Sequence, residues 1–130
     1  VYAWAAGVQL PRTMLALQGG PAQFVFDKGQ LGGPAGLLAL VVSANQHGRA
    51  ELENLALAQA QAQLALPRLH ALKTVIDKRA TFACTPEVAR PDKAIAPQLW
   101  ACGDYIDGPY PATLEGAVRS GIAAAQAVGC

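Results

Sequence analysis

The sequence has few charges, few cysteines and no long hydrophobic run, and each shortage excludes a class of protein. Charged residues make up 15% of the 130 residues, and ten basic side chains against nine acidic ones leave a formal net charge of +1. This balance provides no basic field for nucleic acid or for an anionic membrane surface. Apolar runs such as Gly36 to Val42 are far shorter than the roughly 20 residues that a transmembrane helix needs.

Cysteine and histidine are scarce as well, which leaves little material for a disulfide framework or a metal site. Cys84, Cys102 and Cys130 are odd in number and far apart, so they favour a reducing compartment and a cytoplasmic location. His47 and His70 have no third ligand near them in the sequence, so we expect two loop or surface residues and no bound metal. We expect Cys84 and Cys102 to lie in strands as small buried groups.

The abundant residues predict a folded chain with both strands and helices. Hydrophobic residues make up 52% of the sequence, which is too many for a disordered segment. Glycines and prolines separate short apolar runs, which predict strands at residues 1–4, 14–17, 23–26, 37–43, 72–85 and 99–102. Helices are expected at 51–66, where alanine and glutamine propensity outweighs a period-two pattern, and at 112–128. We therefore predict an α/β or α+β fold with mixed strands and two helices.

Aromatic side chains alternate along two of the expected strands. Tyr2 and Trp4 lie on the first strand, and Phe24 and Phe26 lie on the third. Because residues two apart point to the same face of a sheet, each pair forms a stripe. Such a stripe most often belongs to the core, which is what we expect here. The alternative is that these side chains line a tunnel for an apolar substrate.

The most informative stretch is residues 99–121, LWACGDYIDGPYPATLEGAVRSG. An expected buried strand ends at Gly103 and delivers Asp104 to its carboxyl end, and a helix begins near Thr113. A carboxylate can accept hydrogen bonds from ribose-type hydroxyls, and free amides at a helix start can receive an anionic or carbonyl oxygen. This pattern favours a nucleotide cofactor. The alternative is that Asp104 only caps the following loop by bonding to nearby amides.

The same stretch resembles the C-terminal, flavin-contacting segment of the FAD-dependent amine oxidase and carotenoid desaturase superfamily. The residues that carry this resemblance are the Gly-Asp pair at 103–104 and the run PATLEGAVRSG. Residues 23–30 and 78–83 resemble the squalene-associated desaturase-like branch, the hydroxysqualene dehydroxylases. The resemblance covers most of the chain.

The resemblance implies FAD as the cofactor and five residues that hold it. Gly103 and Asp104 would contact the ribityl or phosphate region of FAD. The backbone of Ala112, Thr113 and Leu114 would approach the flavin ring and its carbonyl, with Leu114 contributing its N–H. The resemblance assigns no catalytic residue.

The chain departs from the superfamily because no glycine-rich dinucleotide fingerprint opens a helix. Residues 29–36 are rich in glycine, but they precede an expected strand. The chain also opens at Val1 in the middle of an expected strand, so we expect the C-terminal fragment of a two-domain FAD-dependent oxidoreductase. Residues 1–76 would belong to its substrate-binding domain and residues 77–130 to its FAD-binding domain.

The parent enzyme implied by the resemblance reduces hydroxysqualene, a polyprenoid, to squalene with loss of water. The alternatives within the superfamily are a phytoene-type desaturase and an amine oxidase. The alternative of another class is a non-catalytic, β-rich module that binds a partner. A membrane-soluble substrate leads us to expect peripheral association with the inner membrane. Apolar surface left exposed on an isolated piece leads us to expect self-association.

Overall fold

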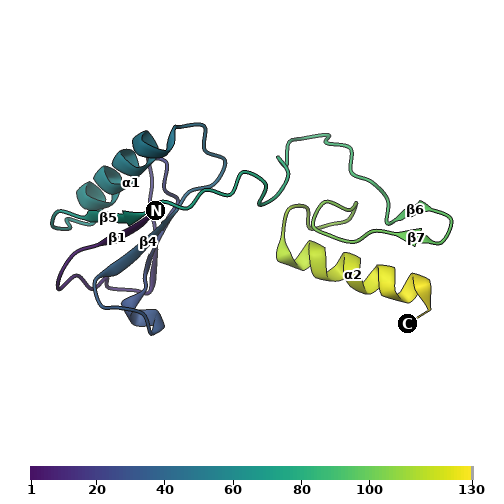
Figure 1. Cartoon of the computed structure of the whole chain (residues 1–130), viewed down its shortest axis with the longest axis horizontal. Coiled ribbons are helices and arrows are strands. Elements are labelled where there is room, and N and C mark those ends of the chain that lie inside the picture. Colours follow the sequence, from purple (N-terminus) through teal and green to yellow (C-terminus); the bar gives the residue numbers. More distant parts are fainter. Residues whose placement is uncertain (130) are drawn as a thin grey trace. The chain divides into compact units, whose positions relative to one another are not determined.

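The structure is a computed structural model that describes residues 1–129, and the chain forms two compact units, Val1–Ile76 (unit 1) and Asp77–Cys130 (unit 2). Figure 1 shows a sheet with one helix in unit 1 and a small hairpin with one helix in unit 2. Two antiparallel sheets with two α-helices make an α+β fold, so this form of the predicted fold class is confirmed. The assignment of the units to a substrate-binding and an FAD-binding domain stays a prediction.

Unit 1 is built on an antiparallel sheet with the strand order β2-β3-β4-β1-β5. Its strands are β1 Tyr2–Trp4, β2 Met14–Ala16, β3 Phe24–Asp27, β4 Leu37–Val41 and β5 His70–Lys73. A short 3₁₀ helix, η1 at Gly29–Leu31, lies between β3 and β4. The helix α1, Arg49–Gln63, lies across one face of the sheet (Figure 1).

The core of unit 1 lies between α1 and the sheet face that it covers. Ala3, Val25 and Leu38 come from the strands and expose no surface. Ala56 and Ala60 come from the helix and are equally buried, in the same apolar cluster. Small side chains four residues apart lie on one helix face, so the helix can pack close to the sheet. The alanine-rich run therefore favours helix formation and also allows α1 to pack close to the sheet.

A glutamine of the same run holds the β2–β3 loop against α1. Gln59 Oε1 accepts a hydrogen bond from the Ala22 amide at 2.9 Å, and its Nε2 donates to the carbonyls of Ala22 at 2.9 Å and Gln18 at 3.1 Å. A Cβ added at Gly20 would lie only 2.5 Å from the Gln59 side chain, so the loop needs glycine there. The side-chain amide of Gln59 therefore provides hydrogen-bond partners for backbone groups of the loop that would otherwise need water.

A buried carboxylate, Asp27, organises the turn after β3. It exposes 1% of its surface. Oδ2 accepts from the Leu10 amide and from Gln30 Nε2, both at 2.9 Å, and Oδ1 accepts from the amides of Gly29 at 3.0 Å and Gln30 at 3.4 Å. Burial alone would raise the pKa of Asp27, but these hydrogen bonds outweigh it and hold the pKa below its usual value.

The strand predicted at 72–85 is wrong, because the structure has only β5, which ends at Lys73. The buried Thr74 then ties the chain to α1: its hydroxyl donates to the Glu53 carboxylate, and its carbonyl accepts from the Arg49 guanidinium. The pairing of β5 with β1 ends at Lys73, which lies opposite Tyr2, the first residue of β1.

Unit 2 has two short strands, one helix and almost no core. The strands β6, Ala94–Ala96, and β7, Leu99–Trp100, form a hairpin, and α2 is Leu114–Val128. Among the residues of this unit that the structure describes, Ile106 alone is buried. The helix predicted at 112–128 is confirmed from Leu114 onward, but none of its residues is buried.

Several predictions of burial in unit 2 are wrong. The strand before Gly103, now β7, was expected to be buried, yet Leu99 exposes 55% of its surface. Cys84 and Cys102 are both exposed and lie outside the strands. A hairpin of two strands offers too little surface to exclude water without a further layer.

Candidate functional site

The sheet of unit 1 carries a continuous apolar face on the side away from α1. Its side chains alternate with core residues along four strands, since successive residues of a strand point to opposite faces. We name this set the apolar sheet face: Tyr2, Trp4, Met14, Phe24, Phe26, Leu37, Ala39 and Val41. The register sets them in rows, with Met14 opposite Phe26, Phe26 opposite Ala39, and Ala39 opposite Tyr2.

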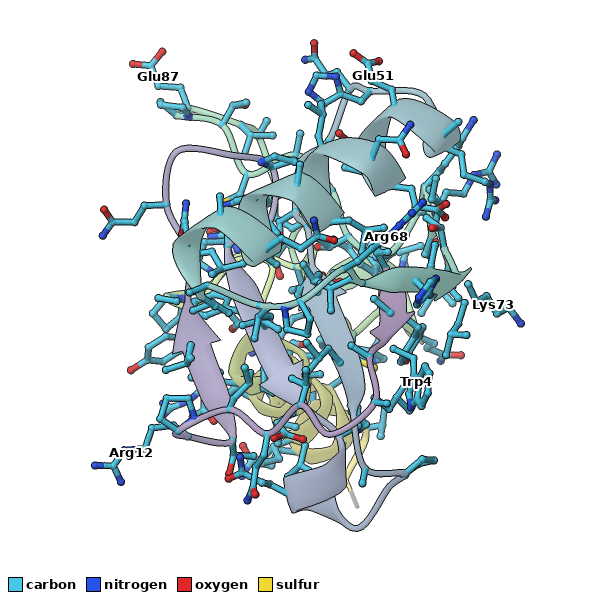
Figure 2. All side chains as sticks on the ribbon, turned by 90° about the vertical axis from the view of Figure 1, so that its left-hand side faces the viewer. Trp4, Arg12, Glu51, Arg68, Lys73 and Glu87 are labelled. Carbon is cyan, nitrogen blue, oxygen red and sulfur yellow. The ribbon has the colours of Figure 1, made fainter. Side chains whose placement is uncertain are left out.

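This face is not core, so the core assignment of the aromatic stripe is wrong. Tyr2 and Trp4 each expose 39% of their surface, and Phe24 exposes 40%. Figure 2 shows Trp4 projecting from unit 1 on the side away from α1. Unit 1 has one α-helix among its described residues, and that helix covers the opposite face. An exposed apolar surface of this extent is typical of a binding surface.

The start of α2 is a capped helix terminus with amides left for a ligand. Thr113 is the N-cap: its Oγ1 accepts from the Gly116 amide at 3.0 Å and donates to the Tyr110 carbonyl at 2.8 Å. Leu114, the first helical residue, has no intrahelical acceptor for its amide. No residue within 1–129 accepts a hydrogen bond from the amide of Thr113 or Leu114.

A backbone hydrogen bond links Asp104 to Ala112, the residue before the Thr113 cap. The Ala112 amide donates to the Asp104 carbonyl at 3.2 Å, so one of the three backbone positions predicted to face the flavin already has a partner for its N–H. One oxygen of the Asp104 carboxylate accepts from the Thr81 hydroxyl, and no described amide of the following loop donates to it. Because a carboxylate has about four lone-pair positions, it can still accept a ligand hydroxyl.

Ser120 fastens α2 to the end of the hairpin, a role that the sequence did not indicate. Its Oγ lies 2.8 Å from the Gly103 nitrogen and 2.9 Å from the Gly103 oxygen. Gly103 has a φ of +153°, and a Cβ there would lie 2.6 Å from the Tyr105 ring, so this position requires glycine. The four-residue spacing of Gly116 and Ser120 places both on one helix face, and this spacing is the feature of the sequence that could have indicated a packed contact there.

Gly116 allows the preceding turn to pack directly on α2. A Cβ at this position would lie 2.1 Å from the Tyr110 carbonyl oxygen. Gly116, the Thr113 cap and the Ser120 hydrogen bonds together fix the position of the free amides at the helix start. These amides therefore hold a defined place relative to Gly103 and Asp104. The structure thus brings the predicted site residues into one local arrangement within unit 2.

The remaining candidates lie in unit 1. His47 Nδ1 lies 3.2 Å from the Glu51 carboxylate, and His70 lies on β5. The glycine-rich residues 29–36 form η1 and a turn that leads into β4. Their amides therefore do not stand at the start of an α-helix, as a dinucleotide fingerprint requires.

No family model, curated protein or solved structure matches the chain. Within residues 1–129, neither α1 nor α2 has the length and apolar character to cross a bilayer. The evidence on function therefore comes from the apolar sheet face and from the start of α2.

Proposed function

We propose that the chain is part of an FAD-dependent oxidoreductase that reduces a polyprenoid, hydroxysqualene, to squalene. The observation that carries this proposal is the apolar sheet face, on which aromatic and aliphatic side chains of four strands lie in register and are exposed or half-buried. A hydrocarbon chain offers almost no hydrogen-bonding groups, so it binds best to an extended apolar surface. In this proposal unit 1 belongs to the substrate-binding domain.

The start of α2 in unit 2 suits one part of FAD. The amides of Thr113 and Leu114 can donate to a flavin carbonyl, and the helix dipole favours negative charge at that point. The Asp104 carboxylate can accept from a ribityl hydroxyl. Bound FAD supplies the hydride chemistry, and these residues hold and orient it.

Replacing Leu114 with proline in the parent protein tests this assignment. Proline is tolerated at the first position of a helix, because the N–H that it removes has no intrahelical partner. The preceding Thr113 has φ −128° and ψ 156°, the extended conformation that proline requires before it. We expect α2 to remain folded and FAD affinity to fall about tenfold, as one lost hydrogen bond to the cofactor predicts.

Leu114→Ala is the matched control, because it keeps the amide and removes a side chain that is 87% exposed. It should leave FAD affinity unchanged. Equal FAD affinity of the proline and alanine variants would exclude this amide from the site. A parent protein without flavin absorption, or without squalene formation from hydroxysqualene under reducing conditions, would contradict the proposed function as a whole.

A second candidate function, a non-catalytic module that binds a partner protein, is favoured by the same exposed apolar surface. It requires no flavin, so the colour of the parent protein distinguishes the two. A phytoene-type desaturase would bind a similar hydrocarbon, and oxidation of phytoene would identify it. An amine oxidase has no need of an extended apolar sheet face. Because its substrate would be membrane-soluble, we also propose that the enzyme associates peripherally with the inner membrane from the cytoplasm.

A further inference from the structure

Unit 2 contains a pocket of about 350 Å³ that includes none of the residues assigned to the flavin. Its walls come from the segment before β6, from the loop 106–110 and from one face of α2. This volume lies within the range of roughly 300 to 1,000 Å³ that is usual for small-molecule sites. The pocket is therefore large enough for a small ligand.

One wall is held in place by Arg90. Its guanidinium donates to the Ile106 carbonyl at 2.9 Å, the Gly108 carbonyl at 2.5 Å and the Asp107 carboxylate at 3.0 Å. The Arg90 side chain exposes only 14% of its surface. Because these bonds use both terminal nitrogens of Arg90, its role is to shape the loop, and its charge is balanced by Asp107.

Two further cations line the pocket. Lys93 comes from the segment before β6, and no residue within 1–129 pairs with its ammonium group. Arg119 comes from α2; its Nε donates to Glu115 at 2.5 Å, and its guanidinium carbon lies 4.9 Å from the centre of the Tyr110 ring. This arrangement leaves the terminal nitrogens of Arg119 for a ligand.

The other lining groups are mainly apolar or already bonded. Ile106, Pro109 and the Tyr110 ring provide apolar surface. The remaining acid, Asp92, accepts from the Ala94 amide at 3.2 Å. The lining residues carry three positive and two negative charges; Asp107 pairs with Arg90, and Glu115 pairs with Arg119, so Lys93 is the lining cation without an acidic partner within residues 1–129.

We propose that this pocket binds a small molecule in which an oxyanion is joined to an aromatic or aliphatic body. Lys93 and Arg119 hold the oxyanion, and the body packs against Tyr110, Ile106 and Pro109. Charged donors make the strongest hydrogen bonds to such anions. None of the five residues assigned to FAD lines this pocket, although Gly116 and Ser120, which help to position the start of α2, also line it.

The test is a titration of the full chain at low salt with phenyl phosphate, followed by NMR shifts of the Gly108 and Tyr110 amides. We expect saturable shifts, and weaker binding of inorganic phosphate, which lacks the apolar body. Lys93→Gln should raise the Kd about tenfold, as loss of one charge-assisted hydrogen bond predicts. Lys93→Arg keeps the charge and should retain binding.

Lys78→Gln is the matched control, since it removes one positive charge from an exposed position of the same unit outside the pocket. It should leave the Kd unchanged. Three results would overturn the proposal: no saturation up to about 10 mM phenyl phosphate, a range that covers very weak sites; an equal loss in Lys78→Gln; or equal affinity for phosphate and phenyl phosphate.

Discussion

Asp27→Asn should be among the most destabilising single substitutions in unit 1, although it changes one atom. The carboxylate of Asp27 accepts four hydrogen bonds while it is almost fully buried. Asparagine keeps one acceptor oxygen, which can still serve the amides of Gly29 and Gln30. Its NH2 group, however, would face the Leu10 amide and Gln30 Nε2. Because all three groups are hydrogen-bond donors, neither contact could remain a hydrogen bond.

The cost follows from those contacts. A buried donor left without an acceptor costs about 1–3 kcal/mol, and the bonds that remain lose the strength that the negative charge gives them. We therefore expect Asp27→Asn to lower the free energy of unfolding of unit 1 by about 2–4 kcal/mol. That is a large part of the 5–15 kcal/mol that is typical of a folded domain.

Urea unfolding followed by tryptophan fluorescence measures this change. Unit 1 contains Trp4 and unit 2 contains Trp100, and the chain has no other tryptophan. In a Trp100→Phe background the signal therefore reports unit 1. Glu51→Gln is the control, because Glu51 is an exposed acid of the same unit and its pairing with His47 at the surface should contribute less than about 1 kcal/mol.

The pH dependence gives an independent check. The pKa of Asp27 is lower in the folded chain than in the unfolded chain, where it is about 3.9. Its contribution is therefore complete above the unfolded value and is lost as the pH falls through the folded pKa. The difference between the original chain and Asp27→Asn should narrow on acidification. A loss below about 0.5 kcal/mol at neutral pH would refute the reasoning, since ordinary surface substitutions change stability by that much.

Two further predictions concern α2. Gly116→Ala should destabilise unit 2, because its Cβ would lie 2.1 Å from the Tyr110 carbonyl oxygen. Gly121→Ala meets open space and should stabilise the helix by roughly 1 kcal/mol. Thermal unfolding followed by circular dichroism compares the two variants, and equal changes in stability would contradict the packing argument. The apolar stripe of α2 should make the full chain self-associate, because Val118 exposes 58% and Ile122 exposes 54% of their surface. Ile122→Glu should then shift the chain toward monomer in sedimentation experiments, and an original chain that is already monomeric at high concentration would exclude this contact.

Local signals in the sequence were sufficient where a single element carries them. Turn residues separated β2 from β3, and both strands, which pair with each other in the structure, were predicted correctly. The start of α2 near Thr113 was predicted correctly, and the structure adds that the Thr113 hydroxyl caps the helix by accepting from the Gly116 amide. The alanine-rich helix was also predicted, because propensity summed over many residues outweighs a weak period-two pattern.

Contacts between distant residues were not predictable in the same way. The bonds of Gln59 to the β2–β3 loop, of Ser120 to Gly103 and of Thr74 to α1 each join segments that only the folded chain brings together. The strand expected at 72–85 failed because β1, its partner, begins at Tyr2 opposite Lys73, which only the register of the folded sheet shows. Nothing in its own residues reveals that Thr74 bonds to the helix.

The sequence by itself determined the first four strands and both helices in their order, but not β6, and it placed Gly103, Asp104 and Thr113 close to one helix start. Its alternation of apolar residues also determined that each strand has two distinct faces. Only the tertiary structure decided which face is buried, because that depends on where the single helix of unit 1 lies. The small residue Ala3 faces α1, and the larger Tyr2 and Trp4 therefore remain on the exposed face.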